Sequence, residues 1–135
     1  MIENEWVERL SGHDGAAVAD ATPAELAAAA ARAAEGKVGR DIIVLDVGDV
    51  LAITDFFVIC HGGSDRQVKA IVDEVAAQLW IAYRLKPARV EGHGDLKWVL
   101  MDYGSFVVHA FDEESRAFYD LERLWKDSER LTWQA

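Results

Sequence analysis

Residues 55–79 read DFFVICHGGSDRQVKAIVDEVAAQL and place a strand, a turn and a helix in one uninterrupted stretch. Residues 56–59 form an apolar run without alternation, which is typical of a strand covered on both faces of its sheet. After two glycines, Ser64 and Gln67 have the spacing of a capping box at a helix start. The apolar residues that follow recur at helical intervals, and they are Val68, Ile71, Val72, Val75 and Leu79. This strand–helix unit predicts an α/β fold.

The segments on either side extend this unit into one mixed sheet. A capping box and a proline predict a helix start at Thr22, and the alanine-rich helix is expected to end at Gly36. The helix that begins after Ser64 is expected to end near Arg84, because the residue before Pro87 is confined to extended geometry. Strands are predicted at residues 41–47, 55–60, 86–91, 98–102 and 106–111, with a tight hairpin at 103–105, a helix from 113 to about 120, and an apolar segment, 121–125, that packs back on the domain.

The predicted fold class is therefore α/β, with a single domain and a mixed sheet of about five strands flanked by helices. The chain has 135 residues, which suits one domain. We assign residues 22–127 to this domain, residues 1–21 to an acidic extension and linker, and residues 128–135 to a tail. The single cysteine excludes an intramolecular disulfide. The sequence lacks a signal peptide and any apolar run of roughly 18 residues, so we expect a cytoplasmic protein without a membrane segment.

The formal net charge of −10 limits the partners that the chain can bind. Lysine and arginine contacts to phosphates supply most non-specific nucleic-acid affinity, so direct nucleic-acid binding is not expected to dominate. An acidic surface instead suits a basic protein partner, because complementary charge speeds encounter and fixes register. Solubility alone is the simpler explanation of the same charge.

The sequence His61-Gly62-Gly63-Ser64 resembles the glycine–serine signature of nucleotidyltransferases. Those enzymes need a pair of carboxylates on a following strand to hold Mg²⁺ between substrate phosphates. The corresponding strand here offers Glu91 with Arg89 two residues before it, so the pair is broken. A nucleotide-binding or nucleotidyltransferase-like enzyme remains the alternative function. The simpler interpretation is that the glycines permit a tight turn and Ser64 caps a helix.

Other reactive side chains do not form a recognisable catalytic pattern. Cys60 ends an apolar strand, where a thiol usually behaves as a small buried hydrophobe. His109 lies in an apolar strand and is expected to be a partly buried histidine with a hydrogen-bond partner, not a catalytic base. The paired short ligand spacings of a zinc site are absent. Asp46, Asp49 and Asp55 flank strand ends, where aspartates usually cap or solvate turns. We predict no catalytic residue, metal or cofactor.

The predicted strand at 98–102 divides its side chains between two faces. Trp98, Leu100 and Asp102 alternate onto one face, and Val99, Met101 and Tyr103 point to the other. A tryptophan beside acidic groups can belong to the core or can anchor an interface, since tryptophan and tyrosine are enriched in interface hot spots. Composition alone favours the core.

Several stretches together resemble one family, the ribosomal silencing factors, which are also called the Iojap family. The resemblance covers about residues 22–127 and rests on the order and spacing of separate motifs. These motifs are DIIVLDV at 41–47, TDFFVIC at 54–60, SDRQVKAI at 64–71, the stretch from Pro87 to Glu91 and Gly92, WVLMDYG at 98–104, VVH at 107–109 and RAFYDLERLW at 116–125.

This resemblance implies an α/β fold distantly like that of the nucleotidyltransferases but without their catalytic carboxylates, and no enzymatic activity or cofactor. It implies binding to the large ribosomal subunit through its ribosomal protein fourteen, at the face that contacts the small subunit. The bound protein would then block subunit joining and repress translation during starvation or stationary phase. The family is also linked to large-subunit biogenesis, and its members can self-associate, which leaves a homodimer open.

The resemblance also implies a docking surface around Glu91, Trp98, Asp102 and Tyr103. Trp98 would be the aromatic anchor, and the carboxylates would meet basic groups of the ribosomal protein, so the resemblance favours an interface role for Trp98 over a core role. One departure concerns Arg84, which stands where the family often has glycine. A left-handed helix cap at this position would be strained for arginine.

Overall fold

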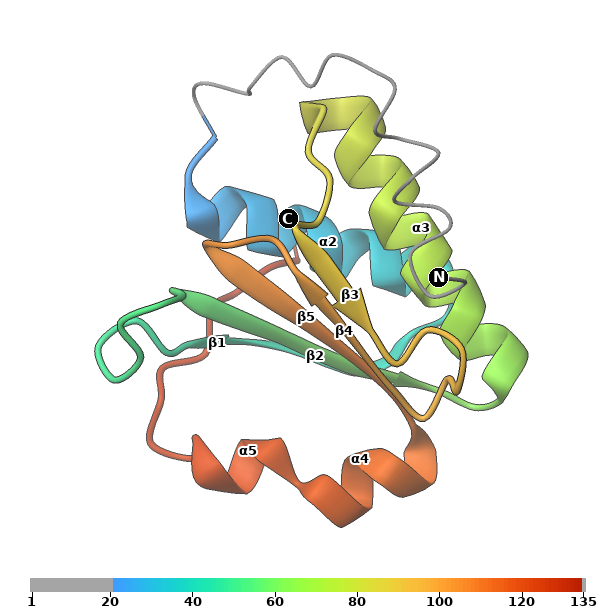
Figure 1. Ribbon diagram of the computed structural model, residues 1–135. Helices are drawn as coiled ribbons and strands as arrows, with labels where there is room; N and C mark the ends of the chain where they lie inside the picture. Colours follow the sequence, from blue (N-terminus) through green and yellow to red (C-terminus); the bar gives the residue numbers. More distant parts are fainter. Residues whose placement is uncertain (1–20, 135) are drawn as a thin grey trace.

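One five-stranded sheet lies between two helical layers in the computed structural model, which describes residues 21–134 (Figure 1). The order of elements and the mixed sheet confirm the predicted fold class. The predicted extension, residues 1–21, lies outside the described residues apart from its last residue. The elements are α2 Pro23–Gly36, β1 Arg40–Asp46, β2 Phe56–Gly62, α3 Asp65–Tyr83, β3 Arg89–Glu91, β4 Trp98–Asp102, β5 Phe106–Asp112, α4 Glu113–Tyr119 and α5 Leu121–Leu124.

The strand order in the sheet is β1-β2-β5-β4-β3. β2 and β5 are parallel, and the other neighbouring pairs are antiparallel. α3 therefore connects two strands of the same direction, β2 and β3, but β5 and β4 lie between them. The predicted hairpin between β4 and β5 is confirmed: the Tyr103 N–H donates to the Phe106 carbonyl at 3.0 Å, and Gly104 takes a φ of 89°. Glycine adopts this left-handed backbone without the strain that a side chain would add.

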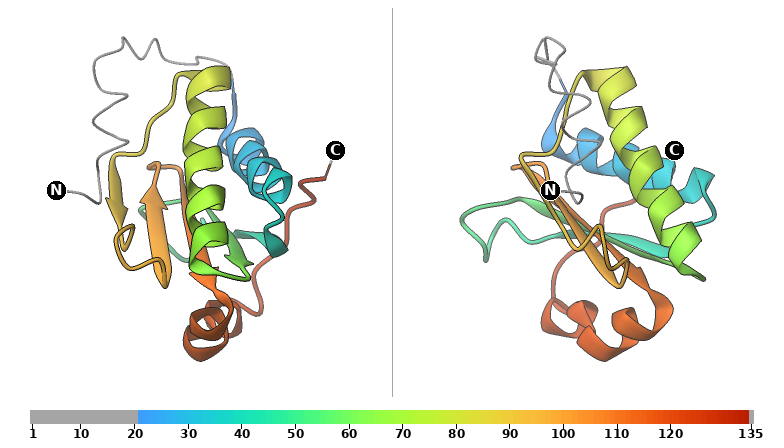
Figure 2. Two further views of the ribbon diagram at one scale, coloured as in Figure 1. Left: turned by 90° about the vertical axis from the view of Figure 1, so that its right-hand side faces the viewer. Right: turned by 45° about the vertical axis from the view of Figure 1, so that its right-hand side comes forward.

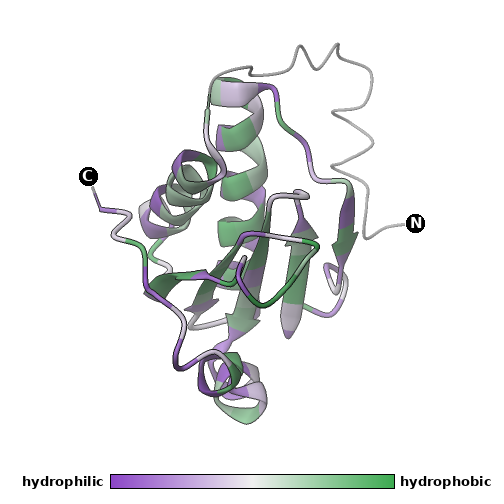
Figure 3. Ribbon diagram, turned by 90° about the vertical axis from the view of Figure 1, so that its left-hand side faces the viewer, coloured by the Kyte–Doolittle hydropathy of each residue, from purple (hydrophilic) through white to green (hydrophobic). Residues whose placement is uncertain are grey.

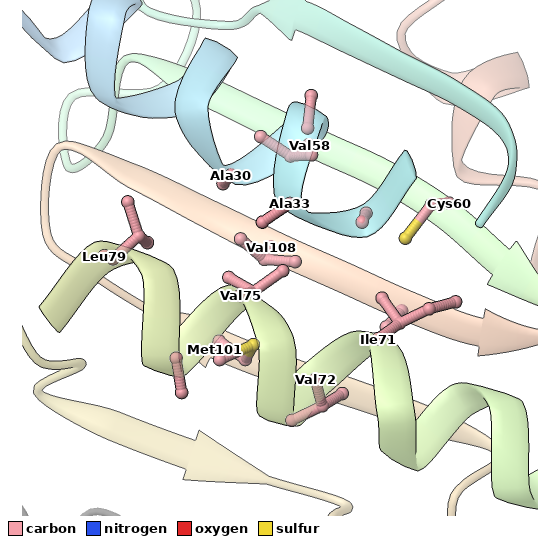
Figure 4. Packing of buried hydrophobic residues seen from close by; sticks show 14 of the residues in the cluster. Ala30, Ala33, Val58, Cys60, Ile71, Val72, Val75, Leu79, Met101 and Val108 are labelled. Atoms are coloured by element: carbon pink, nitrogen blue, oxygen red, sulfur yellow. The ribbon is translucent and has the colours of Figure 1, made fainter. Parts of the chain in front are cut away.

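α2 and α3 cover one face of the sheet, which we call the inner face (Figure 2). Five alanines of α2 are buried, so this helix approaches the sheet and α3 closely. In the apolar cluster on this face, Val75 of α3 lies beside Val108 of β5, and Val58 of β2 lies by Ala30 and Ala33 of α2 (Figure 4). Cys60 is fully buried in the same cluster, and burial raises the pKa of its thiol to about 12. The thiol is thus a small buried hydrophobe, as predicted.

α4 and α5 pack on the opposite face, which we call the outer face (Figure 1). A second apolar cluster lies beneath them, built from Leu45, Ile59 and Phe111, with Leu121 and Trp125 packed against it. The apolar segment after α4 therefore returns to the domain, as predicted. This cover lies over β1, β2 and β5, and the outer side chains of β3 and β4 remain half-buried or exposed. Within residues 21–134, no helix combines the length and apolar character needed to cross a membrane.

The chain after α5 runs antiparallel to β1 and pairs with its outer edge. The Asp46 N–H donates to the Glu129 carbonyl at 2.8 Å, and the Leu131 N–H donates to the Val44 carbonyl at 2.9 Å. Trp133 is buried in the inner cluster. These contacts satisfy backbone groups of β1 that would otherwise face solvent as an open sheet edge.

The helix starts follow the predicted chemistry with one difference. Thr22 and Glu25 form the full capping box of α2. At α3, the Ser64 hydroxyl accepts from the Gln67 N–H at 3.2 Å, but the Gln67 side chain accepts from the Gly63 N–H at 2.7 Å. The reciprocal bond thus reaches one residue before the cap, and the predicted capping box at Ser64 is only half formed.

The end of α3 has the left-handed cap that the sequence analysis described as strained for arginine. Arg84 takes left-handed angles, with φ at 53° and ψ at 32°. The N–H groups of Arg84 and Leu85 donate to the Trp80 and Leu79 carbonyls, which closes the helix end. The Arg84 guanidinium lies 5.4 Å from the centre of the Trp80 ring.

We expect Arg84→Gly to raise the free energy of unfolding by about 1 kcal/mol, because it relieves a left-handed non-glycine residue. The gain exceeds the loss of an exposed cation–π contact, which is worth about 0.5 kcal/mol. Urea unfolding checks this prediction. Arg84→Ala is the matched control: it loses the cation–π contact and keeps the backbone strain, so it should be no more stable than the wild type. Equal stabilities of the glycine and alanine variants would contradict the explanation.

Candidate docking surface

The outer face of β3 and β4 is the part of the sheet that the helices leave open. Glu91 pairs with Leu100 across the two strands, and Arg89 pairs with Asp102. These side chains therefore lie on one face together with Trp98. Three of the four predicted docking residues, Glu91, Trp98 and Asp102, are brought together here. We call this region the Trp98 surface.

Tyr103, the fourth predicted residue, lies on the other face of the sheet. Only 8% of it is exposed, and its ring stacks on Phe106 with 4.8 Å between ring centres. Burial raises the pKa of the Tyr103 phenol far above its usual range. The placement of Tyr103 on the docking surface is thus corrected: the residue belongs to the core beneath α2 and α3. Strand alternation already separated it from Trp98 and Asp102 in the sequence.

Trp98 is half-buried and held in a fixed orientation. Its indole N–H donates to Nδ1 of His109 at 3.1 Å. The indole also stacks on Phe111, with ring centres 5.0 Å apart, and contacts Tyr119 of α4 at 4.7 Å. A large side chain that is already ordered loses little conformational entropy when it binds a partner. Trp98 is therefore suited to act as a rigid aromatic anchor.

His109 supports this anchor from below. Only 4% of the residue is exposed, and burial lowers the pKa of its imidazole to about 4. Because Nδ1 accepts the hydrogen bond from Trp98, the neutral ring carries its proton on Nε2. A protonated imidazole has no acceptor and would break this bond. His109 thus has a hydrogen-bond partner, as predicted, and its role is to position Trp98.

Acid should destabilise the protein through His109. The folded-state pKa of about 4 lies below the ordinary histidine value of 6.5, so the unfolded chain takes up the proton first as the pH falls. The stabilising contribution is complete above about pH 7 and decreases as the pH falls towards the folded-state pKa. We expect a loss of about 2 kcal/mol between about pH 8 and about pH 5.

The matched control is His109→Asn, which keeps an acceptor near the position of Nδ1 but does not titrate. The difference in unfolding free energy between wild type and variant, measured by urea titration at each pH, cancels the shared carboxylates and His61. The stability of the wild type relative to the variant should fall by about 2 kcal/mol between about pH 8 and about pH 5. A difference that is constant with pH would contradict the prediction.

The carboxylates of the Trp98 surface share one cation. Arg89 lies 3.2 Å from Glu91 and 3.6 Å from Asp102. Asp102 also accepts a hydrogen bond from the Gly104 N–H at 2.9 Å, which shapes the hairpin turn. The Glu91 side chain is 59% exposed, and exposed pairs of this kind contribute little stability. A cation from a partner can therefore replace or share the contact with Glu91 at small cost.

The turn His61-Gly62-Gly63-Ser64 is occupied by contacts within the chain. The Gly63 N–H already donates to Gln67, and Ser64 caps α3. A Cβ atom on Gly62 would lie 2.9 Å from the Val68 backbone nitrogen, so close packing of the strand end on the helix requires glycine. The tight turn and the capping role are thus confirmed. Among residues 21–134, no three histidine, cysteine or acidic side chains are grouped so that they could hold a metal ion.

Among residues 21–134, Cys60 does not lie beside His61 or His109 in a way that could form a catalytic pair. Cys60 lies in the inner core, and His109 lies under the outer cover. His61 alternates away from Cys60 and lines a hollow beside Arg116 of α4. Burial and the Arg116 charge lower the pKa of His61.

Arg116 organises the junction of α4, α5 and β1, and sequence reasoning missed it. Its guanidinium binds one oxygen of Glu122 at 3.0 and 2.9 Å, the Arg40 carbonyl at 3.1 Å and Nδ1 of His61 at 3.0 Å. The residue is 8% exposed. Because Glu113 lies three positions before Arg116 on α4, the sequence pattern is that of an ordinary surface ion pair and gives no sign that the arginine is buried. Only the motif RAFYDLERLW, which contains both Arg116 and Glu122, indicated that this segment matters.

Comparisons with known proteins show which proteins this chain resembles. The model of the family described as "Ribosomal silencing factor during starvation" matches residues 20–135. A Bacillus subtilis protein named ribosomal silencing factor RsfS is 40% identical over 73% of this chain and 83% of its own length. A mouse protein named mitochondrial assembly of ribosomal large subunit protein 1 is 36% identical over 64% of this chain, but over only 39% of its own length.

Solved structures extend the similarity to three dimensions. A crystal structure of a Chromobacterium violaceum protein superposes with a TM-score of 0.75 and 32% identity, covering 85% of this chain and 94% of that one. A Bacillus halodurans structure superposes with a TM-score of 0.67 and 35% identity, covering 76% and 92%.

Proposed function

Because the chain belongs to the ribosomal silencing factor family, we propose that it docks on the large ribosomal subunit through the Trp98 surface and blocks joining of the small subunit. Its direct partner in this proposal is the large-subunit ribosomal protein fourteen. By covering the face of that protein where the small subunit binds, the docked chain represses translation during starvation or stationary phase. The mechanism is steric, so it breaks no bond and requires no cofactor.

The observation that carries the proposal is the state of Trp98. It is half-buried, its orientation is fixed by His109 and two aromatic rings, and it lies on the open part of the outer face. Pre-ordered aromatic side chains that are partly exposed are typical centres of binding energy. Glu91 and Asp102 add acidic groups to the same face, and the net charge of −10 suits a basic ribosomal protein.

The family relationship supports one further part of the proposal, and the open question of self-association bears on it. The mouse relative is named for assembly of the large subunit, and a role of this chain in large-subunit biogenesis would use the same docking. A homodimer formed through Trp98 would cover the Trp98 surface. Self-association and ribosome docking would then compete, so the monomer would be the active species in the cytoplasm.

Trp98→Ala tests the proposal directly. We expect its affinity for purified large subunits to fall about 100-fold, which is about 2.7 kcal/mol and within the range of interface hot spots. Sedimentation through a sucrose gradient measures binding, and a subunit-joining assay measures the block. Circular dichroism verifies that the variant is folded, since it also loses the bond to His109. If a folded Trp98→Ala protein co-sediments with large subunits as the wild type does, the proposal is contradicted.

A charge-reversal pair tests the acidic groups of the same surface. Glu91→Lys should weaken large-subunit binding about 10-fold and make it less sensitive to salt, because a rim carboxylate acts mainly through complementary charge. Glu35→Lys is the matched control: Glu35 is an exposed carboxylate on α2, which covers the inner face. Equal effects of the two substitutions would mean that net charge, not the Trp98 surface, governs binding.

A further inference from the structure

The loop between β1 and β2, and α5 beside it, expose large apolar side chains. Val50 in the loop is 73% exposed and Leu124 in α5 is 75% exposed, and both line a hollow of about 550 Å³ together with Trp125. Ile53 in the same loop is 84% exposed. Figure 3 faces this loop and shows hydrophobic stretches both in the loop and in the helices below it. Apolar side chains gathered at the surface in this way commonly mark an interaction site.

The charged side chains that line this hollow have one sign. Those that line it are Asp46, Asp49, Asp127 and Glu129, and none of the described residues of its lining is a lysine or arginine. Asp46 accepts a hydrogen bond from the Gly48 N–H at 3.1 Å, so it also shapes the loop. An apolar rim with an acidic lining is complementary to a chain segment that carries apolar and cationic side chains together. The same carboxylates repel the phosphates of a nucleic acid.

We infer that this hollow is a second docking surface, and that its occupant is an extended basic segment of a protein partner, with apolar side chains among its lysines or arginines. The apolar side chains pack between Val50 and Leu124. The cations pair with Asp49 and Asp127, which are both exposed. The partner thus gains apolar burial and charge pairing at one place.

The hollow lies apart from the Trp98 surface but is connected to it. β2 and β5 separate β1, at the edge of the hollow, from β4, which carries Trp98. Leu124 also lines the neighbouring depression on α4 and α5, together with Phe118 and Tyr119. The Tyr119 ring in turn contacts Trp98 at 4.7 Å. This continuity of apolar side chains allows two segments of one partner assembly to occupy both surfaces at once.

The test uses the purified full chain, labelled with ¹⁵N, and a short synthetic peptide of alternating lysine and leucine. We expect amide shifts in NMR spectra to be confined to residues 47–53 and 121–129. Peptides with serine in place of leucine, or glutamate in place of lysine, should bind at least ~10-fold more weakly, a difference of about 1.4 kcal/mol. Equal binding of the three peptides, or shifts spread over other parts of the domain, would overturn the inference.

Variants locate the binding. Val50→Ser with Leu124→Ser, and separately Asp49→Lys with Asp127→Lys, should each weaken peptide binding about 10-fold. The matched controls are Ile81→Ser, at a side chain that is 66% exposed on α3, and Glu35→Lys on α2, and both should bind like the wild type. All of these side chains are exposed, so the fold should tolerate the changes. Unchanged binding in the hollow variants would refute the inference.

Trp98→Ala should retain the peptide, and loss of binding in this variant would assign the peptide to the Trp98 surface instead. The experiment contains no ribosome. A negative result with the peptide therefore does not contradict the proposed ribosomal function. A negative result in the ribosome-binding experiments does not contradict this second docking surface.

Discussion

Replacing Trp133 by alanine is expected to lower the free energy of unfolding by about 4 kcal/mol, as for other buried tryptophans. Trp133 is 6% exposed and belongs to the inner core, although it is the third residue from the end of the chain. Its indole N–H donates to the Ile42 carbonyl at 3.2 Å, and its own carbonyl accepts from Arg32 at 3.0 Å. The substitution leaves a cavity and removes one of the contacts that hold the C-terminal segment along β1.

Denaturant unfolding measures this loss, and Thr132→Ala is the matched control because Thr132 is exposed beside Trp133. The control should change stability by less than about 0.5 kcal/mol. The variant should also expose the outer edge of β1, so we expect more aggregation near its unfolding midpoint. A loss below about 1 kcal/mol in Trp133→Ala would show that the C-terminal segment does not contribute to the core in solution.

Replacing Arg116 by methionine is expected to cost about 3 kcal/mol, at the lower end of values for broken buried ion pairs. The methionine keeps most of the aliphatic stem but leaves the Glu122 carboxylate, the Arg40 carbonyl and Nδ1 of His61 without the guanidinium. The Arg116 and Glu122 side chains are 9% and 26% exposed, so solvent compensates only part of the loss. α4 and α5 should then detach more readily from the outer face, and Tyr119 with them from Trp98.

A double-mutant cycle separates the ion pair from general packing. Arg116→Met with Glu122→Leu removes both charges, so it should be less destabilised than the sum of the two single changes. Arg123→Met is the surface control, because Arg123 is exposed on α5. Additive single changes, or equal losses for Arg116→Met and Arg123→Met, would contradict a stabilising role for the buried cluster.

The helices and strands were predictable because their signals are local. Capping residues and periodic apolar residues lie within a few positions of one another, so the spacing in the chain reflects the spacing in space. The boundaries moved by a few residues, most at β3, which holds only Arg89–Glu91 of the predicted 86–91. β3 pairs with β4 alone, so its length depends on a partner that local sequence does not specify.

The candidate site was predictable in part. The alternation of β4 placed Trp98 and Asp102 on one face, and the family resemblance selected that face as the docking surface. Tyr103 was added to the surface from the resemblance although the same alternation placed it opposite. The structure supports the alternation, because the covering helices α2 and α3 bury that side.

The sequence by itself determined the α/β class, the order of elements, the face of each strand side chain and the family, because these depend on patterns of neighbouring residues. Only the tertiary structure decided which partners meet: Trp98 with His109, Arg116 with His61 and the Arg40 carbonyl, and Trp133 with Ile42. Arg116 and Arg40 are 76 positions apart in the chain, and Trp133 and Ile42 are 91 positions apart. These contacts stabilise the fold because buried polar groups find hydrogen-bond partners and aromatic surface leaves water. Both depend on the packing of the whole sheet and its helices and not on any local pattern.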